Sequence, residues 1–107
     1  MVKVSVLYPY QADSRFDFEY YTDNHISHSI ELLSAHPGFK GAMIERGMGG
    51  GVPGSPPIYI AMSHFQFESM DAFTEAFMPH AQQIQDDVPN FTNINPILQF
   101  NKVLLEF

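Results

Sequence analysis

The residues of this chain best suited to acid–base chemistry lie together between Arg15 and His28. The stretch reads RFDFEYYTDNHISH and holds two adjacent tyrosines followed by two histidines. Phe18, Tyr21 and His25 are three and four residues apart, which puts their side chains on one face of a helix. An imidazole among aromatic rings on an inward face loses hydration, and this loss favours its neutral form near neutral pH. His25 is therefore a candidate base, hydrogen-bond donor or ligand; the structural alternative is a core histidine hydrogen-bonded to a carbonyl.

A single helix is predicted to position these side chains. Ser14 or Asp17 can cap its start, and Pro37 with Gly38 stops it. The inward stripe is expected to continue beyond His25 with the following residues: His28 or Ser29, and then Leu32.

The length and composition indicate one domain spanning residues 1–107 with an aromatic core. The chain is 45% hydrophobic and holds ten Phe and five Tyr with no Trp, so phenyl and phenol rings must supply much of the core volume. A domain of this size is only modestly stable alone, so association with a second copy would help.

The charge balance excludes several classes of partner. Five basic residues face twelve acidic ones, for a net charge of −7 without a basic cluster, which makes nucleic acid and anionic membrane surfaces poor partners. The absence of cysteine excludes disulfides, thiolate metal sites and cysteine nucleophiles. Neither a signal peptide nor a membrane span is apparent in the apolar pattern, so we expect a cytoplasmic protein that does not bind membranes.

The rest of the chain reads as strands and one more helical region. Alternating residues predict strands over 2–9, 39–48 and 58–67, with a Gly- and Pro-rich loop over 49–57. Ser69 should cap a second helix that Pro79 breaks or kinks, and that ends before Asp86 and Asp87, to which we assign no function. A last strand is predicted over 91–107, and because Pro96 removes a ladder donor, this strand should lie at a sheet edge or be bulged.

The order strand, helix, strand, strand, helix, strand is the split βαβ pattern, in which both helices cover one face of an antiparallel sheet. Several strands carry apolar residues on both faces, so the other face also needs a cover. Two sheets packed across a two-fold axis would provide it, which predicts a homodimer.

Over nearly its whole length the sequence resembles the EthD (ethyl tert-butyl ether degradation) family of dimeric α+β barrel proteins. The resemblance rests on four segments taken together: VKVSVLYP at the start, RFDFEYY with His25 four residues on, Tyr59–Phe67 followed by ESMDAF, and PNFTNINP with Gln99. The family pattern usually continues His-x-Pro-Leu-Val, whereas this chain has His-Ile-Ser-His-Ser, which leaves a more continuous helix. The resemblance implies a ferredoxin-like protomer whose sheet dimerises into a barrel, with a small-molecule pocket, lined by His25, between sheet and helices.

The first functional hypothesis is a cofactor-independent enzyme, oxygenase- or isomerase-like, acting on a small apolar or aromatic metabolite. His25 would be its general base or hydrogen-bond donor, and Tyr21 would orient the imidazole. Strand residues offer further polar groups for the substrate: Tyr8, Tyr59, Ser63, His64 and Gln99. Strand alternation puts Tyr59 and Ser63 on one face and His64 on the other, so these three cannot all line one cavity.

Three alternatives remain open from the sequence. A non-catalytic binding protein of the same fold would have the same pocket, and a purely structural dimerisation module would have none. A metal site would need His25 and His28 with His80 or an acidic residue, but no metal-binding motif supports it. A haem would need only one axial histidine, His25 or His80, and a large apolar cavity. We expect neither a metal nor a cofactor.

Overall fold

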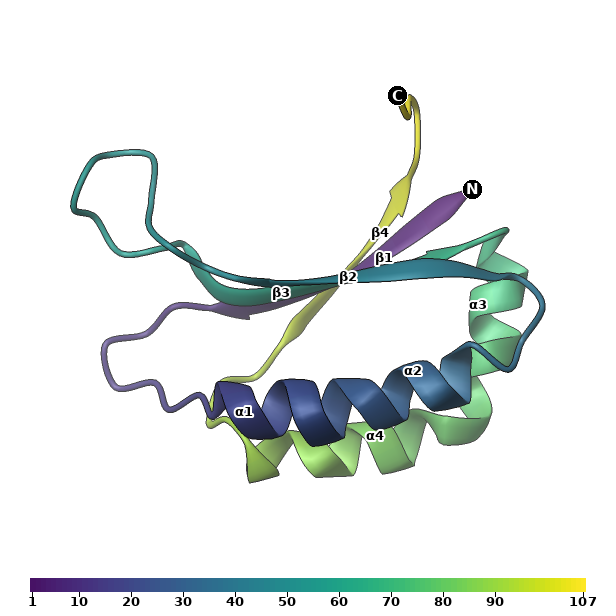
Figure 1. Ribbon diagram of the computed structural model, residues 1–107, viewed down its shortest axis with the longest axis horizontal. Helices are drawn as coiled ribbons and strands as arrows, with labels where there is room; N and C mark the ends of the chain where they lie inside the picture. Colours follow the sequence, from purple (N-terminus) through teal and green to yellow (C-terminus); the bar gives the residue numbers. More distant parts are fainter.

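Hydrophobic alternation builds a four-stranded antiparallel sheet of order β2-β3-β1-β4. The computed structural model describes all of residues 1–107. The strands are β1 (Val2–Pro9), β2 (Phe39–Arg46), β3 (Tyr59–Phe67) and β4 (Ile97–Lys102). Two helical arms cover one face of this sheet, so the architecture is the expected α+β split βαβ arrangement (Figure 1).

The first helical arm carries His25 and contains a π-helical segment. It comprises α1 (Phe18–Tyr20), the π-helical η1 (Tyr21–Ile26) and α2 (Ser27–Leu33). Asp17 caps the arm, because its carboxylate accepts a hydrogen bond of 3.0 Å from the Tyr20 amide. The arm ends at Leu33, where the following proline and glycine predicted a stop.

The π-helical segment changes which side chains face the sheet. Within its wider turn Tyr21, His25 and Ile26 are buried, and Ser29 and Leu33 continue the buried face in α2. The expectation that Leu32 continues the inward stripe was wrong: Leu33 is buried instead. Of the two alternatives after His25, Ser29 faces inward and His28 faces solvent.

The second helical arm bends at Pro79, as its sequence predicted. It comprises α3 (Met70–Phe77), a single 3-10 turn η2 (Met78–His80), α4 (Ala81–Asp87) and a further turn η3 (Val88–Asn90). Ser69 caps α3 by accepting a 3.1 Å hydrogen bond from the Ala72 amide. The expected end before Asp86 and Asp87 was wrong, because α4 includes both residues.

The last strand is shorter than predicted and begins directly after Pro96. In the preceding segment Phe91 and Ile94 are buried, and Thr92 forms an isolated bridge with Phe16. This segment therefore packs against the first arm instead of continuing the sheet. β4 nonetheless lies at the sheet edge, where the proline placed it.

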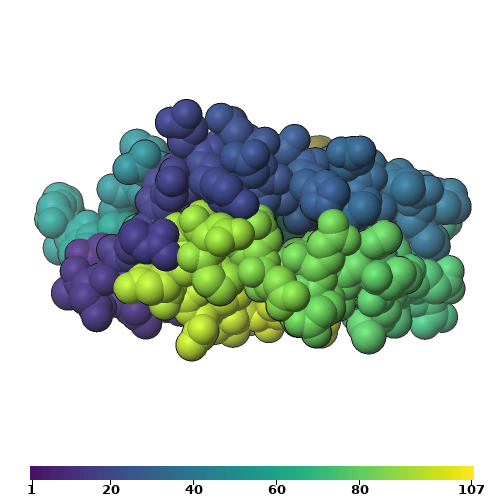
Figure 2. All heavy atoms as spheres, turned by 90° about the horizontal axis from the view of Figure 1, so that it is seen from below, coloured from purple at the N-terminus to yellow at the C-terminus, as the bar shows by residue number.

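The core lies between the sheet and the two arms, which run side by side over its lower face (Figure 2). Aromatic rings dominate it: Phe91, fully buried, lies within 4.6 to 6.4 Å of five other rings, those of Tyr8, Phe16, Tyr20, Tyr21 and His25. None of the helices has the length and apolar character that a bilayer span requires.

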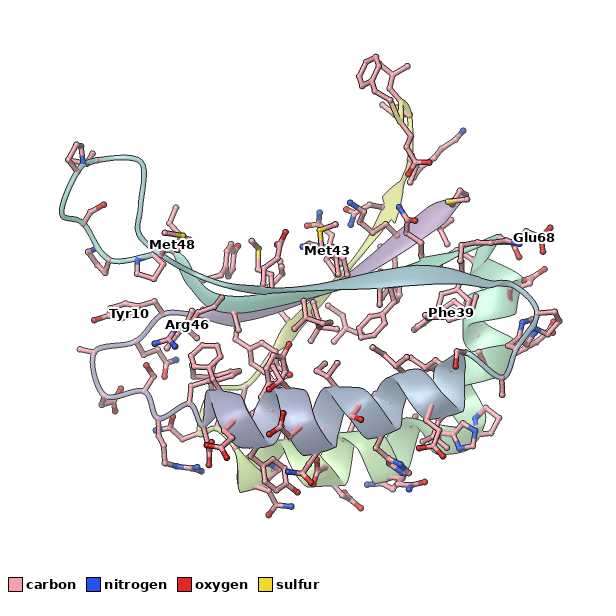
Figure 3. All side chains as sticks on the ribbon, in the orientation of Figure 1. Tyr10, Phe39, Met43, Arg46, Met48 and Glu68 are labelled. Carbon is pink, nitrogen blue, oxygen red and sulfur yellow. The ribbon has the colours of Figure 1, made fainter.

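The opposite face of the sheet is uncovered. Met43 points away from the helices, whereas Phe39 and Arg46 lie on the helical side (Figure 3). Met43 and Ile97 remain 63% and 51% exposed on this face. A chain of side-chain hydrogen bonds crosses all four strands here, from Asn101 to Ser5 to His64 to Glu45, at distances of 2.9, 2.7 and 3.0 Å.

Candidate functional site

A cavity of about 90 Å³ lies between the sheet and the helical arms. Eleven of its sixteen lining residues are hydrophobic, and they come from β1, β3, both arms and the start of β4. Apart from Pro96 the other lining residues are polar, and they are few, as is typical of small-molecule sites: His25, Ser29, Ser63 and Gln85. Tyr8, counted among the eleven, adds a hydroxyl. The cavity is smaller than the roughly 300 Å³ at the low end for drug-sized ligands. A porphyrin therefore does not fit within it.

His25 is held in the cavity wall by the π-helical segment and by two aromatic rings. Its side chain is only 6% exposed. The Tyr21 ring lies nearly parallel to the imidazole at 6.1 Å between ring centres, and the Phe91 ring lies at 4.6 Å. Imidazole Nδ1 lies 2.9 Å from Asp87 Oδ2, which leaves Nε2 as the ring nitrogen without a partner in the chain.

Asp87 is the orienting partner of His25, a role that the sequence did not reveal. Besides His25, its carboxylate accepts hydrogen bonds from the Tyr20 hydroxyl at 2.7 Å and from Asn90 Nδ2 at 2.9 Å. The sequence offered no reason to assign Asp87 a function, yet its carboxylate accepts three hydrogen bonds, one of them from His25. The sequence predicted that Tyr21 orients the imidazole of His25. Tyr21 stacks on the imidazole without hydrogen-bonding to it, and the hydrogen bond that orients the ring is made to Asp87.

The electrostatics of the pair define the protonation state of His25. Burial lowers the pKa of His25 below its ordinary 6.5, although the hydrogen bond and charge of Asp87 oppose the shift. For Asp87, burial alone would raise the pKa, but the hydrogen bonds from Tyr20, Asn90 and His25 outweigh it and hold the pKa below 3.8. At neutral pH the carboxylate therefore faces a neutral imidazole. Nδ1 must then carry the proton, which leaves the Nε2 lone pair available as a base.

Three hydroxyl groups lie near the sheet side of the cavity. Tyr8 and Ser63 line it directly and are each 2% exposed. The Tyr21 hydroxyl is buried next to Ser63 and is the one buried side-chain polar atom of the chain with no hydrogen-bond partner. Burial raises the pKa of Tyr21 to about 12, partly offset by the Ser63 hydroxyl, and burial also raises the pKa of Tyr8.

The structure brings together some of the predicted site residues and separates others. His25, Tyr8 and Ser63 share the cavity, and Tyr21 packs beside them. Three predicted residues do not line it. Tyr59 lies beside the Gly-rich loop near a bulge in the β1 pairing, and His64 and Gln99 lie on the uncovered face of the sheet.

The two helical histidines that the metal alternative would use also do not converge. His28 points to solvent, where its Nε2 lies 2.7 Å from Gln83 Nε2, while His25 faces inward. No group of three or more His, Asp or Glu side chains in this chain is arranged to hold a metal ion.

A polar depression adjoins the cavity on the helical side. His25, Ser29 and Ile84 line both the depression and the cavity, so these side chains form part of the wall between the two spaces. The depression itself is lined by Tyr20, Asn24, His28, Gln83 and Asp87.

Comparison with known proteins adds to this geometry. Residues 10–95 match the EthD domain. An EthD-like protein from Ralstonia eutropha JMP134 is 35% identical in sequence, with a TM-score of 0.91 over 99% of this chain and 94% of the other. This chain belongs to the EthD family.

More distant structures share the ferredoxin-like fold of this EthD protein. An EthD family protein from Bacillus halodurans is 18% identical, with a TM-score of 0.70 over 97% of this chain and 99% of the other. SnoaB from Streptomyces nogalater, a cofactor-independent oxygenase, is 14% identical, with a TM-score of 0.60 over 98% of this chain and 93% of the other. No curated protein sequence matched the chain.

Proposed function

We propose that this EthD protein is a small-molecule enzyme that removes a proton from an apolar or aromatic substrate, with His25 Nε2 as the general base. The observation that carries the proposal is the 2.9 Å hydrogen bond between His25 Nδ1 and Asp87 in the wall of an apolar cavity. This bond fixes the tautomer in which Nε2 can accept a proton. The Asp87 carboxylate then stabilises the imidazolium that forms.

The surroundings of His25 suit the deprotonation of a carbon acid or a phenol. A mostly apolar cavity excludes water, so the substrate anion is not quenched by solvent. This step uses only side chains of the protein, so it fits a cofactor-independent reaction. The anion would then take a proton at another atom, as in an isomerase, or react with dioxygen, as in an oxygenase. We include the reaction with dioxygen because the oxygenase SnoaB has the same fold.

The proposed base is tested by deuterium exchange. A panel of small cyclic and aryl ketones is incubated with the protein in deuterated water, and loss of the acidic C–H signals is followed by proton NMR. Replacing a general base typically lowers the rate by about 10²- to 10⁴-fold, and we expect this loss for His25→Ala. His80→Ala is the matched control, because that ring lines neither the cavity nor the adjoining depression.

Two results would contradict the proposal. A His25→Ala variant with the full exchange rate would exclude His25 as the base. Ketones that bind to the wild-type protein without any exchange would favour the alternative of a binding protein of the same fold.

We also propose that the protein is a homodimer formed through the uncovered face of the sheet. Met43 and Ile97 on this face leave apolar surface exposed in the single chain. The hydrogen bonds from Asn101 through Ser5 and His64 to Glu45 satisfy the central polar groups of the face within one chain. Their burial against a second sheet would therefore leave few unpaired polar atoms.

A further inference from the structure

One hydroxyl group beside the cavity, that of Tyr21, is fully buried without a hydrogen-bond partner. The neighbouring side chains of Tyr8 and Ser63, each 2% exposed, line the cavity itself. Leaving a buried hydroxyl unpaired is unfavourable, and native proteins rarely do so without a reason. An unpaired buried hydroxyl next to two hydroxyl-bearing side chains of the cavity wall indicates that a ligand completes the hydrogen bonding there.

The chemistry of these groups selects what kind of atom they bind. Burial holds the pKa of both tyrosines well above its ordinary value, so each stays a neutral O–H donor. Hydroxyl donors that converge without a competing charge suit an oxygen that gains negative charge during reaction. The other lining side chains near these hydroxyls, such as Val4, Val6 and Phe65, offer only apolar contacts.

Resting on the proposed function of His25, we infer that Tyr8 and Ser63 bind the oxygen of a ketone, enol or phenol substrate. Tyr21 is a positioning residue: its hydroxyl lies behind Ser63 and donates to the Ser63 hydroxyl when that group turns to the ligand. The imidazole removes the acidic proton, and the electron pair left behind moves onto the oxygen held by the hydroxyls. The substrate class is thus a small apolar molecule with one carbonyl or phenolic oxygen, because the cavity offers no charged partner for a second polar end.

The inference is tested with phenol and toluene, which differ only by a hydroxyl in place of a methyl group. Affinities are measured by NMR titration of the wild-type protein and of Tyr8→Phe, Ser63→Ala and Tyr21→Phe. We expect phenol affinity to fall by about three- to tenfold in Tyr8→Phe and in Ser63→Ala, with toluene affinity unchanged, because each variant removes one hydrogen bond.

Tyr21→Phe gives a separate readout of the unpaired hydroxyl. Without ligand, this variant should melt at the same temperature as the wild-type protein or higher, because it removes an unpaired buried group. Its phenol affinity should still fall. A lower melting temperature with unchanged phenol affinity would mean that the hydroxyl serves the fold and not the ligand.

Other outcomes overturn the inference as a whole. They are phenol and toluene affinities that fall equally, phenol affinity that stays constant in every variant, and wild-type protein that binds neither probe. These results are distinct from failure of His25 as a base. If deuterium exchange depends on His25 but phenol binds no better than toluene, only the hydroxyl site is rejected. If phenol binds better than toluene but no deuterium exchange occurs, only the role of His25 as base is rejected.

Discussion

The role of Asp87 gives the sharpest prediction, through the variant Asp87→Asn. The amide oxygen of asparagine can still accept the hydrogen bond from His25 Nδ1, but the charge is lost and the amide nitrogen replaces the oxygen that accepts from Tyr20 and Asn90. Because the hydrogen bond and charge of Asp87 raise the pKa of His25 against the effect of burial, removing the charge must lower that pKa further.

The size of the effect follows from the exposure of the pair. A hydrogen bond to a charged group contributes about 1.5–3 kcal/mol. The His25 side chain is 6% exposed but that of Asp87 is 28% exposed, so solvent screens the pair and the lower end applies. About 1.5 kcal/mol corresponds to a fall of about one unit in the pKa of His25. The same loss of imidazolium stabilisation slows proton abstraction by about tenfold.

The pKa is measured by NMR titration of the His25 ring nitrogens, and the rate by the deuterium exchange described for His25→Ala. In Asp87→Asn the maximum rate should fall while the acidic limb of the pH profile moves to lower pH, a combination that a folding defect would not produce. Asp86→Asn is the matched control, because that neighbouring carboxylate is exposed and accepts only from Gln82. A His25 pKa that stays constant or rises in Asp87→Asn would refute the reasoning.

Three further predictions concern the fold and its association. Phe91→Ala should lower the free energy of unfolding by about 3–5 kcal/mol in urea titrations, because Phe91 is 0% exposed and central to the aromatic cluster; an effect below about 1 kcal/mol would contradict this placement. Ser69→Ala should cost about 1 kcal/mol in the same assay through loss of the α3 cap, and Ser69→Asp should restore most of it. Met43→Asp should convert the proposed dimer to a monomer in sedimentation experiments, whereas Met78→Asp, equally exposed but on the helical side, should not; a monomeric wild-type protein would reject the dimer.

Local sequence signals predicted the frame of the fold. Ser69 caps the start of α3, and Pro79 lies in the turn where the second arm bends. Both features could therefore be inferred from neighbouring residues alone. Strand alternation likewise separated Ser63 from His64. These features depend on backbone geometry over a few residues, which is what periodicity and capping report.

The decisive contact of the site could not be inferred in this way. Asp87 lies sixty-two residues from His25 along the chain, and only the packing of α4 against the first arm brings them together. A carboxylate at a helix C-terminus interacts unfavourably with the helix dipole. The sequence therefore predicted that the helix ends before Asp87 and gave no indication of its contact with His25. The π-helical segment was equally hidden, because it depends on how Tyr21 and His25 pack against the sheet and Phe91.

The His25–Asp87 pair also predicts how stability depends on pH. Since the folded protein holds the pKa of His25 below 6.5, the unfolded chain binds the proton more readily, and stability must fall as the pH drops from about 6.5 toward the folded pKa. Asp87 also makes the folded protein less stable as the pH falls, but in a lower pH range. Its stabilisation of the fold is complete above pH 3.8 and is lost as the pH falls through the depressed pKa of its carboxyl. Urea titrations over this range should therefore show a decline that starts near pH 6.5, and His25→Gln should remove the upper part of that decline. If the variant and the wild-type protein lose stability in parallel between neutral and mildly acidic pH, His25 is not held neutral by the fold, and its assignment as a base ready for proton transfer at neutral pH fails with it.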